Sequence, residues 1–208
     1  MESRTGTLWA KQDQHVGDRL RLFTAVAEAV DATTVLYPGS FVDVAPSFAF
    51  RSVTYIDSDR RAEQFFSDAE GVDEIISANR DDDRPREVIF IPADYREDLG
   101  LSDESFDLLV SLYAGFISEH CGHHLAVGGS LLVNPSHGDA AMASIDPRFE
   151  LSAVVKSANG EYRVDAAQLD TYLIPKKPQT VTVESLHESG RGVGYTKSPF
   201  AYLFRRVR

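Results

Sequence analysis

The feature that most restricts the fold is a series of short apolar runs separated by segments with helical character. The runs are rich in valine, isoleucine and leucine, and each has the length of a β-strand. Five of them lie at positions 33–37, 52–57, 88–94, 105–112 and 129–134. Strands that are apolar along their whole length are buried on both faces, which is typical of a parallel sheet covered by helices. The sequence therefore predicts an α/β fold.

The predicted helices begin before the first run. Apolar residues recur at spacings of three and four between positions 13 and 30, which predicts one amphipathic helix there. The members of this stripe are Val16, Leu20, Phe23, Ala27 and Val30. A second helix is expected after the run at 52–57, where Ser58 or Asp59 can cap it, and a further helical piece is expected at 72–78.

The last third of the chain has a different pattern. Two runs, 149–157 and 161–166, flank Asn159-Gly160, a dipeptide typical of a tight β-hairpin. Two more runs, 179–185 and 199–207, follow, and we expect no helix between them. The sheet is thus predicted to end in antiparallel strands. We expect a single domain over 1–208, with a helical segment at 1–31, a core at 32–148 and the antiparallel strands at 149–208.

Composition restricts the class of partner. The formal net charge is −11, and a surface so acidic repels the phosphate backbone of nucleic acids, which makes nucleic acid an unlikely partner. No apolar run approaches the roughly 18 residues of a membrane span, and the N-terminus has no signal-peptide pattern. With a single cysteine, Cys121, these features favour a cytoplasmic protein. No feature specifies an oligomeric state.

Five motifs follow one another in a recognisable order. They are "TTVLYPGSFVD", "VTYIDSD", "VIFIPAD", "SFDLLVSLYAGF" and "HLAVGGSLLVN". Together with the antiparallel finish, they resemble the class I S-adenosylmethionine-dependent methyltransferases, from about Asp13 to Arg208. The most specific match is the Gly128-Gly129 turn before the fifth strand, with Val127 where the family has proline. The resemblance implies a Rossmann-like methyltransferase fold, mostly parallel with helices on both faces, and S-adenosylmethionine as cofactor.

The first motif departs from the family. The family carries an acid and three spaced glycines there, whereas this chain has Tyr37, Gly39, Phe41 and Asp43 at those positions. The segment is either a rewired cofactor loop or an ordinary Pro-Gly turn that ends a buried strand. We expect a rewired loop in which Gly39, Ser40 and Phe41 contact the cofactor. On this hypothesis Gly39→Val abolishes binding through collision with the methionine portion while leaving the fold intact, and Asp43→Gly has little effect.

The resemblance assigns further cofactor contacts. Asp57 ends the second strand, 18 positions after Gly39, where the family binds the ribose hydroxyls; the alternative is a helix cap. Asp94, next to the small Ala93, corresponds to the adenine contact; the alternative is a solvated loop aspartate. Other strand-end residues complete the predicted cofactor site, namely Tyr37, Ser58 and Ser111.

The reaction, if it needs a base, is assigned to residues after the fourth and fifth strands. His137 and Tyr113 are the predicted catalytic residues, and Asp139 is a further candidate that can instead cap the next helix. No separate substrate domain is evident, so we expect a small-molecule methyl acceptor. The alternatives are a protein of this fold that binds S-adenosylmethionine or another nucleotide without methylating, and a partner-binding module.

Two other patterns have ordinary structural explanations as well as functional ones. His120 and His124 lie four apart with Cys121 between them, but Gly122 weakens a helix there and no second ligand cluster follows, so no metal is predicted. The segment 188–195, "ESGRGVGY", resembles a phosphate-binding loop but precedes a strand instead of a helix. We expect it to be a mobile loop that covers the substrate.

Overall fold

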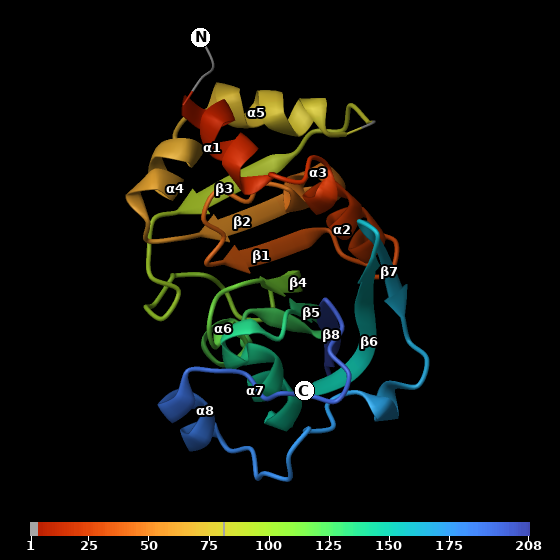
Figure 1. The fold of residues 1–208 in the computed structure, drawn as a ribbon. Helices are drawn as coiled ribbons and strands as arrows, with labels where there is room; N and C mark the ends of the chain where they lie inside the picture. Colours follow the sequence, from red (N-terminus) through yellow and green to blue (C-terminus); the bar gives the residue numbers. More distant parts are fainter. Residues whose placement is uncertain (1–3, 81) are drawn as a thin grey trace.

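The computed structural model describes residues 4–80 and 82–208 and contains one eight-stranded sheet with the order β3-β2-β1-β4-β5-β8-β6-β7 (Figure 1). The strands are β1 (Thr34–Pro38), β2 (Ser52–Ile56), β3 (Glu87–Ile91), β4 (Phe106–Ser111), β5 (Leu125–Val133), β6 (Phe149–Ala158), β7 (Glu161–Asp165) and β8 (Ala201–Arg206). Strands β1 to β5 are parallel, and β8 is antiparallel to both of its neighbours. The predicted fold class is confirmed.

The strand order reverses between β1 and β4. From β1 the chain proceeds outward through β2 and β3, then returns to place β4 on the other side of β1. The connections that leave β1 and β4 therefore diverge at the carboxyl ends of these two strands. Open α/β sheets bind ligands at such a switch point. The topology thus indicates the carboxyl edge of the parallel strands as the place for a ligand site.

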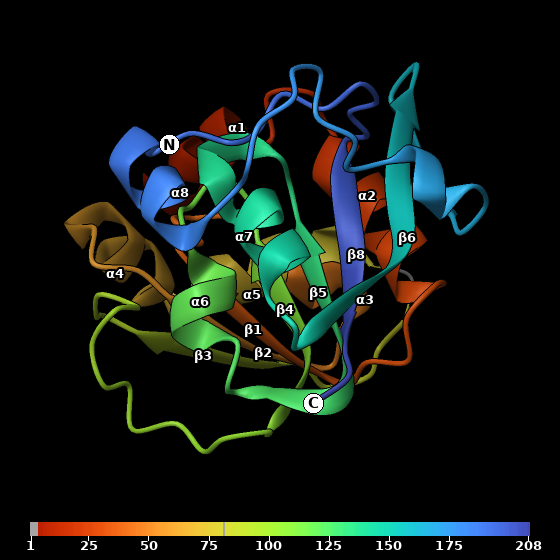
Figure 2. The ribbon, with the colours of Figure 1, turned by 90° about the horizontal axis from the view of Figure 1, so that it is seen from below.

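Helices cover both faces of the sheet, as predicted. One apolar cluster includes residues of α1 (Arg4–Gln12), α2 (Asp18–Ala27), α3 (Pro46–Ala49), α4 (Arg60–Phe66) and α5 (Ala69–Ala78). The other includes residues of α6 (Ile117–Cys121), α7 (Asp139–Ile145) and α8 (Val183–Ser189), of which α6 and α7 lie over β4 and β5 (Figure 2). Val35 and Tyr37 of β1 face the first cluster and Leu36 faces the second. No helix in the described ranges is long and apolar enough to cross a bilayer.

The helix predicted over 13–30 is confirmed over 18–27, and its predicted start at position 13 is wrong. The chain forms α1, turns, and starts α2 at Asp18, with Gly17 in the left-handed conformation (φ 77°) between them. The Gly17 amide donates to Oδ2 of Asp13 (2.9 Å), which closes the turn. Val16 consequently lies outside the apolar stripe and is 86% exposed, whereas Phe23 is fully buried.

The C-terminal strands are confirmed in part. Asn159 (φ 55°) and Gly160 (φ 77°) make the tight turn of the β6–β7 hairpin, and β8 forms as expected. The run at 179–185 does not form a strand, because helix α8 begins within it. A reciprocal capping box between Thr182 and Ser185 starts that helix, and Gly190 (φ 57°) ends it. The cap chemistry outweighed the β-branched composition of the run. Two short 3-10 turns complete the elements: η1 (Ser136–Gly138) lies between β5 and α7, and η2 (Leu169–Thr171) lies between β7 and α8.

Candidate functional site

Unusual backbone conformations gather at the carboxyl edge of the parallel strands. Among the described residues, eight non-glycine residues have positive φ, and four of them follow β1, β4 and β5. These four are Phe41 (49°), Tyr113 (64°), Phe116 (57°) and His137 (57°). Such a conformation costs about 1–3 kcal/mol per residue and persists where a site over-determines it. The clustering makes this edge the candidate functional site.

The loop after β1 is fastened to the end of β2. The Gly39 amide donates to the Ile56 carbonyl (2.8 Å), and the Phe41 amide donates to Oδ2 of Asp57 (2.7 Å). The other oxygen of Asp57 accepts the amide hydrogen of Asp59 (2.8 Å). A carboxylate has about four acceptor positions, so the half-buried Asp57 is oriented by the backbone and retains capacity for two further donors.

The alternative role of Asp57, as the cap of the following helix, belongs to Asp59 instead. The Asp59 side chain accepts from the Arg61 amide (2.7 Å) and caps α4, while Ser58 is exposed. Arg61 also places its guanidinium 4.8 Å from the centroid of the Phe41 ring, a cation–π contact that joins α4 to the β1 loop. Asp57, Phe41 and Ser58 therefore line one stretch of the edge.

Tyr37 does not belong to that stretch. Only 2% of it is exposed, and its hydroxyl donates to Oδ2 of Asp43 (3.0 Å). Asp43 is fully buried and forms an ion pair with Arg19 of α2. Burial raises the pKa of Tyr37, against the opposing effect of the Arg19 charge. Where the family has an acid at the end of the first strand, this chain has a buried Arg19–Tyr37–Asp43 network on the α2 side.

Gly39 is required by a contact within the protein. A Cβ atom at this position would lie 2.7 Å from Cβ of Ala114, in the loop after β4, and the backbone has φ 66°. The same added atom would lie 3.8 Å from Cε1 of Tyr95, whose hydroxyl donates to the Gly115 carbonyl (2.9 Å). Tyr95 thus crosses from the loop after β3 to the loop after β4, beside Gly39. Sequence reasoning missed Tyr95, although it directly follows the predicted Asp94.

Asp94 lies at the same edge in an ion pair. Its carboxylate, 27% exposed, accepts from Nε of Arg96 at 2.9 and 3.1 Å and also from the terminal nitrogen. These hydrogen bonds lower the pKa of Asp94 to about 2. Ala93 is half-buried beside it. The Asp94 carboxylate is therefore fixed in position by Arg96 and remains partly exposed.

This ion pair predicts an unusual titration. In a carbon-detected NMR titration, the Asp94 carboxyl should titrate near pH 2, and Arg96→Ala should return it toward about 3.9. Because the folded-state pKa is lowered, the pair stabilises the fold above about pH 4 and loses that contribution as the pH falls toward 2. Arg61→Ala, which removes the partner of Asp59 instead, should leave the Asp94 titration unchanged. An ordinary midpoint for Asp94 in the unmodified chain would show that the pair does not form.

Asp139 and Ser111 lie below the edge. Asp139 is fully buried, and it accepts hydrogen bonds from the Ser111 hydroxyl and from the Ser118 amide (3.1 Å) and hydroxyl. Burial raises the pKa of Asp139, against these hydrogen bonds. Asp139 thus joins β4, α6 and α7, and its role as a candidate base is corrected to a structural one. Ser111, with 1% exposed, does not reach the edge either. Ser40 is also buried, with 2% exposed.

The two predicted catalytic residues are both exposed at the edge. Tyr113 is 59% exposed, and its amide donates to Oδ1 of Asn134 (3.4 Å), which links the loops after β4 and β5. A Cβ atom on Gly115 would lie 3.7 Å from Cβ of His137. The structure therefore places His137 and Tyr113 on adjacent loops.

The glycine-rich segment packs beside His137. An added Cβ on Gly192 would lie 2.5 Å from the Pro135 carbonyl, and one on Gly138 would lie 3.2 Å from the Arg191 carbonyl. Side chains at these two glycines would separate the segment from the loop after β5. Glu188 and Ser189 end helix α8, and the rest of the segment packs against the loop after β5, so that this segment covers a substrate stays a prediction.

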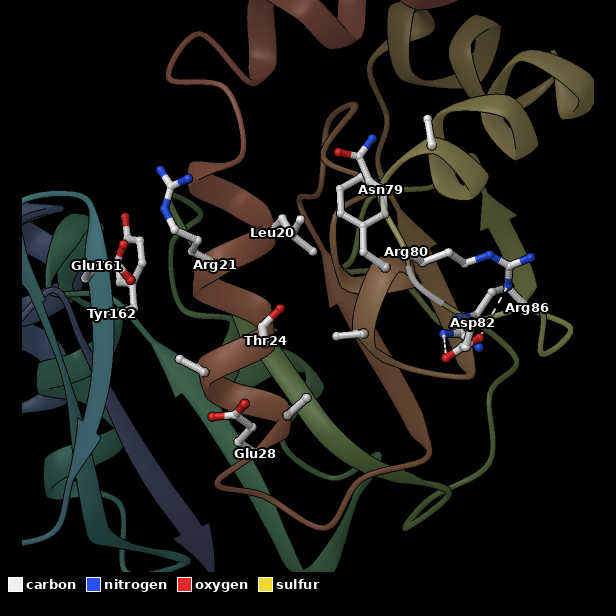
Figure 3. A pocket seen from close by; sticks show the side chains of 15 residues that line it. Leu20, Arg21, Thr24, Glu28, Asn79, Arg80, Asp82, Arg86, Glu161 and Tyr162 are labelled. Atoms are coloured by element: carbon white, nitrogen blue, oxygen red, sulfur yellow. Dashed lines mark hydrogen bonds and ion pairs between the residues drawn. The ribbon is translucent and has the colours of Figure 1, made fainter.

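A groove of about 810 Å³ lies away from this edge, around α2 and the loop before β3 (Figure 3). Its lining includes Leu20 and Thr24 of α2, with Arg80, Asp82 and Arg86 across from them. Arg86 pairs with Asp82 (3.0 Å). The groove is near the amino ends of β2 and β3 and contains none of the predicted site residues.

No family model matches this chain, and no curated protein does. Solved structures with a similar arrangement include an rRNA methylase from Streptococcus thermophilus, 12% identical over 89% of this chain and 94% of the other, with a TM-score of 0.47. A putative methyltransferase from Bacillus halodurans is 15% identical over 89% and 96%, at 0.46. The [4+2]-cyclase SpnF is 19% identical over 58% of this chain and 45% of its own, at 0.43. This chain thus spans less than half of the cyclase. At such identities the likeness concerns the fold alone.

Proposed function

We propose that this chain, which has the Rossmann-like methyltransferase fold, binds S-adenosylmethionine at the carboxyl edge and transfers its methyl group to a small molecule. The observation that carries the proposal is the state of Asp57. Its carboxylate is oriented by two backbone amides, is half-buried at the end of β2, and keeps free acceptor positions. A ribose diol supplies the two donors that such a carboxylate lacks.

Other residues at this edge would hold the base of the cofactor and the methyl acceptor. Asp94 and Ala93 lie on the neighbouring loop, where a flat base can lie against the small side chain, and Tyr95 adds an aromatic ring. When bound, S-adenosylmethionine would supply an electrophilic methyl group. The exposed imidazole of His137 would accept a proton from the methyl acceptor, and Tyr113 would orient that acceptor, so that alignment supplies much of the rate.

One observation favours the second candidate function, nucleoside binding without methyl transfer. The amides of Gly39 and Ser40 donate to the Ile56 carbonyl, and the Phe41 amide donates to Asp57. These amides are already paired, so they offer no free donor to the carboxylate of a methionine portion. A ligand without that carboxylate, such as another nucleoside, would lose less at this loop.

Calorimetry on Asp57 variants tests the ribose contact. Asp57→Ala removes the acceptor and should weaken binding of S-adenosylmethionine and S-adenosylhomocysteine by about ten- to a hundredfold, since a hydrogen bond to a charged group contributes roughly 1.5–3 kcal/mol. Asp59→Ala is the matched control, because it removes the α4 cap, costs about 1 kcal/mol of stability, and should leave affinity unchanged. Unchanged affinity in a folded Asp57→Ala protein would refute the assignment.

Turnover then separates the candidates. Formation of S-adenosylhomocysteine with a panel of small acceptors would support methyl transfer, and RNA in the same panel tests the expectation from the acidic surface. Binding of both sulfur nucleosides without product would support the second candidate. If neither nucleoside binds the folded protein, the proposed cofactor is wrong and a partner-binding module is the better description.

A further inference from the structure

We infer that Asp103, His123 and His124 form a binding site for a divalent transition-metal ion, with zinc as the ion that suits them best. Each residue offers one ligand atom, and these atoms all lie within 4.8 Å of one another. Within the described ranges 4–80 and 82–208, these three residues are the one group of at least three possible metal ligands that lie this close together. The cluster lies at the amino ends of β4 and β5, at the opposite edge of the sheet from Asp57, so it does not depend on the proposed function.

The ligand atoms are close to the spacing that a zinc ion needs. Nε2 of His123 is 3.9 Å from Oδ1 of Asp103, and the ring centroids of His123 and His124 are 3.9 Å apart. Bonds of about 2.0–2.2 Å in a tetrahedral site separate the ligand atoms by roughly 3.4 Å. The side chains of His123 and Asp103 are 47% and 74% exposed, so both can rotate slightly to bring their ligand atoms to this spacing.

The backbone holds the two contributing segments together. The Glu104 amide donates to the His123 carbonyl (3.0 Å), and the amides of Ser105 and Phe106 donate to the His124 carbonyl (3.0 and 3.1 Å). The loop before β4 and the turn between α6 and β5 are therefore joined directly at the ligand residues. Ordered backbones at the ligands reduce the entropy that metal binding must offset.

His124 is prepared as a ligand by its second nitrogen. Nδ1 lies 3.1 Å from the Ser102 carbonyl, which can only accept, so Nδ1 carries the hydrogen and Nε2 keeps its lone pair. Metal-binding histidines commonly have such a partner, which sets the tautomer. His124 is only 5% exposed, so its ring is held by the residues packed around it.

The surrounding charges favour a cation. Asp98, Asp103 and Glu104 carry carboxylates near the cluster. Arg206 opposes them with a guanidinium that donates to Glu104 (3.1 Å) and to the His123 carbonyl (3.2 Å). Two imidazole nitrogens and one carboxylate suit zinc better than calcium or magnesium, which prefer oxygen ligands. Water would complete the coordination.

This cluster shares only His124 with the His120, Cys121 and His124 pattern in the sequence. His120, Cys121 and His124 do not converge there: Cys121 is buried, with Sγ 3.6 Å from the Tyr95 carbonyl, and His120 packs near the Tyr95 ring at 6.2 Å. Asp103, 20 positions before His123, supplies the third ligand instead. A metal here would fasten the β3–β4 connection to the turn before β5.

Calorimetry with zinc chloride on the full chain, after treatment with a chelator, tests the site. We expect saturable binding of one zinc ion and a higher melting temperature with zinc than without it. The double variant Asp103→Asn/His123→Asn changes two exposed ligands and should weaken binding at least about 100-fold, because loss of an outer-shell partner alone costs 10–100-fold.

Two controls make the result decisive. The variant His15→Asn/Asp73→Asn removes the same two residue types at exposed positions outside the cluster and should bind zinc as the unmodified chain does. Calcium chloride should give no comparable heat. The inference is overturned by absence of saturable zinc binding, by equal affinity in the Asp103→Asn/His123→Asn protein, or by calcium binding as tightly as zinc.

Discussion

Replacing Asp43 with alanine is expected to lower the free energy of unfolding by about 3–5 kcal/mol. The substitution removes the fully buried carboxylate that pairs with Arg19 and accepts the Tyr37 hydroxyl. The Arg19 side chain, 9% exposed, would be left with an uncompensated charge. Thermal unfolding of a domain this size should show a fall in Tm of roughly 10 °C.

A double variant separates this cause from loss of packing. Arg19→Met with Asp43→Ala removes both charges, and it should be more stable than Asp43→Ala alone, because the stranded charge is the main cost. Tyr37→Phe keeps the ion pair and should cost about 1 kcal/mol. An Asp43→Ala protein within 1 kcal/mol of the unmodified chain would contradict the network, as would a double variant that loses the sum of the single effects. The expectation that Asp43→Gly does little is revised on the same grounds.

Gly39→Val is expected to lower the free energy of unfolding by about 2–4 kcal/mol. Valine is β-branched and would have to adopt φ 66°, and its Cβ would lie 2.7 Å from Cβ of Ala114. Denaturant unfolding should therefore show a lower midpoint at unchanged slope. The expectation that this variant keeps its fold intact and affects only ligand binding is corrected, because the first atoms to collide belong to the protein.

The collision partner provides the control. Combining Gly39→Val with Ala114→Gly removes the methyl group that the new side chain meets, so part of the lost stability should return. The remainder reports the left-handed backbone, which Ala114→Gly does not relieve. A Gly39→Val protein as stable as the unmodified chain would contradict the contact. If the double variant is no more stable than Gly39→Val, the clash with Ala114 is not the cause.

The sequence by itself determined the sheet, because the signals that specify it are local. Apolar runs such as 52–57 and 105–112 have the length and composition of buried strands, and Asn159-Gly160 has the residues that a tight hairpin turn needs. The position of Asp57 at the end of β2 follows from the same patterns, so its place at the ligand edge was predictable. Two local predictions were wrong. The turn at Gly17 delays the start of the helix that periodicity predicts from position 13, and the Thr182 cap starts a helix where β-branched composition predicts a strand.

The tertiary structure decided which of the predicted site residues face outward and which are used by the fold. Tyr37 and Asp43 turn toward α2 because Arg19, 24 positions before Asp43, satisfies a buried carboxylate there. Ser111 and Asp139, 28 apart, meet inside the second core, and Asp103 meets His123 and His124 through pairing of the segments around them. Each of these outcomes depends on a partner that is distant in the chain, and burial makes a polar group take the partner that the fold brings to it.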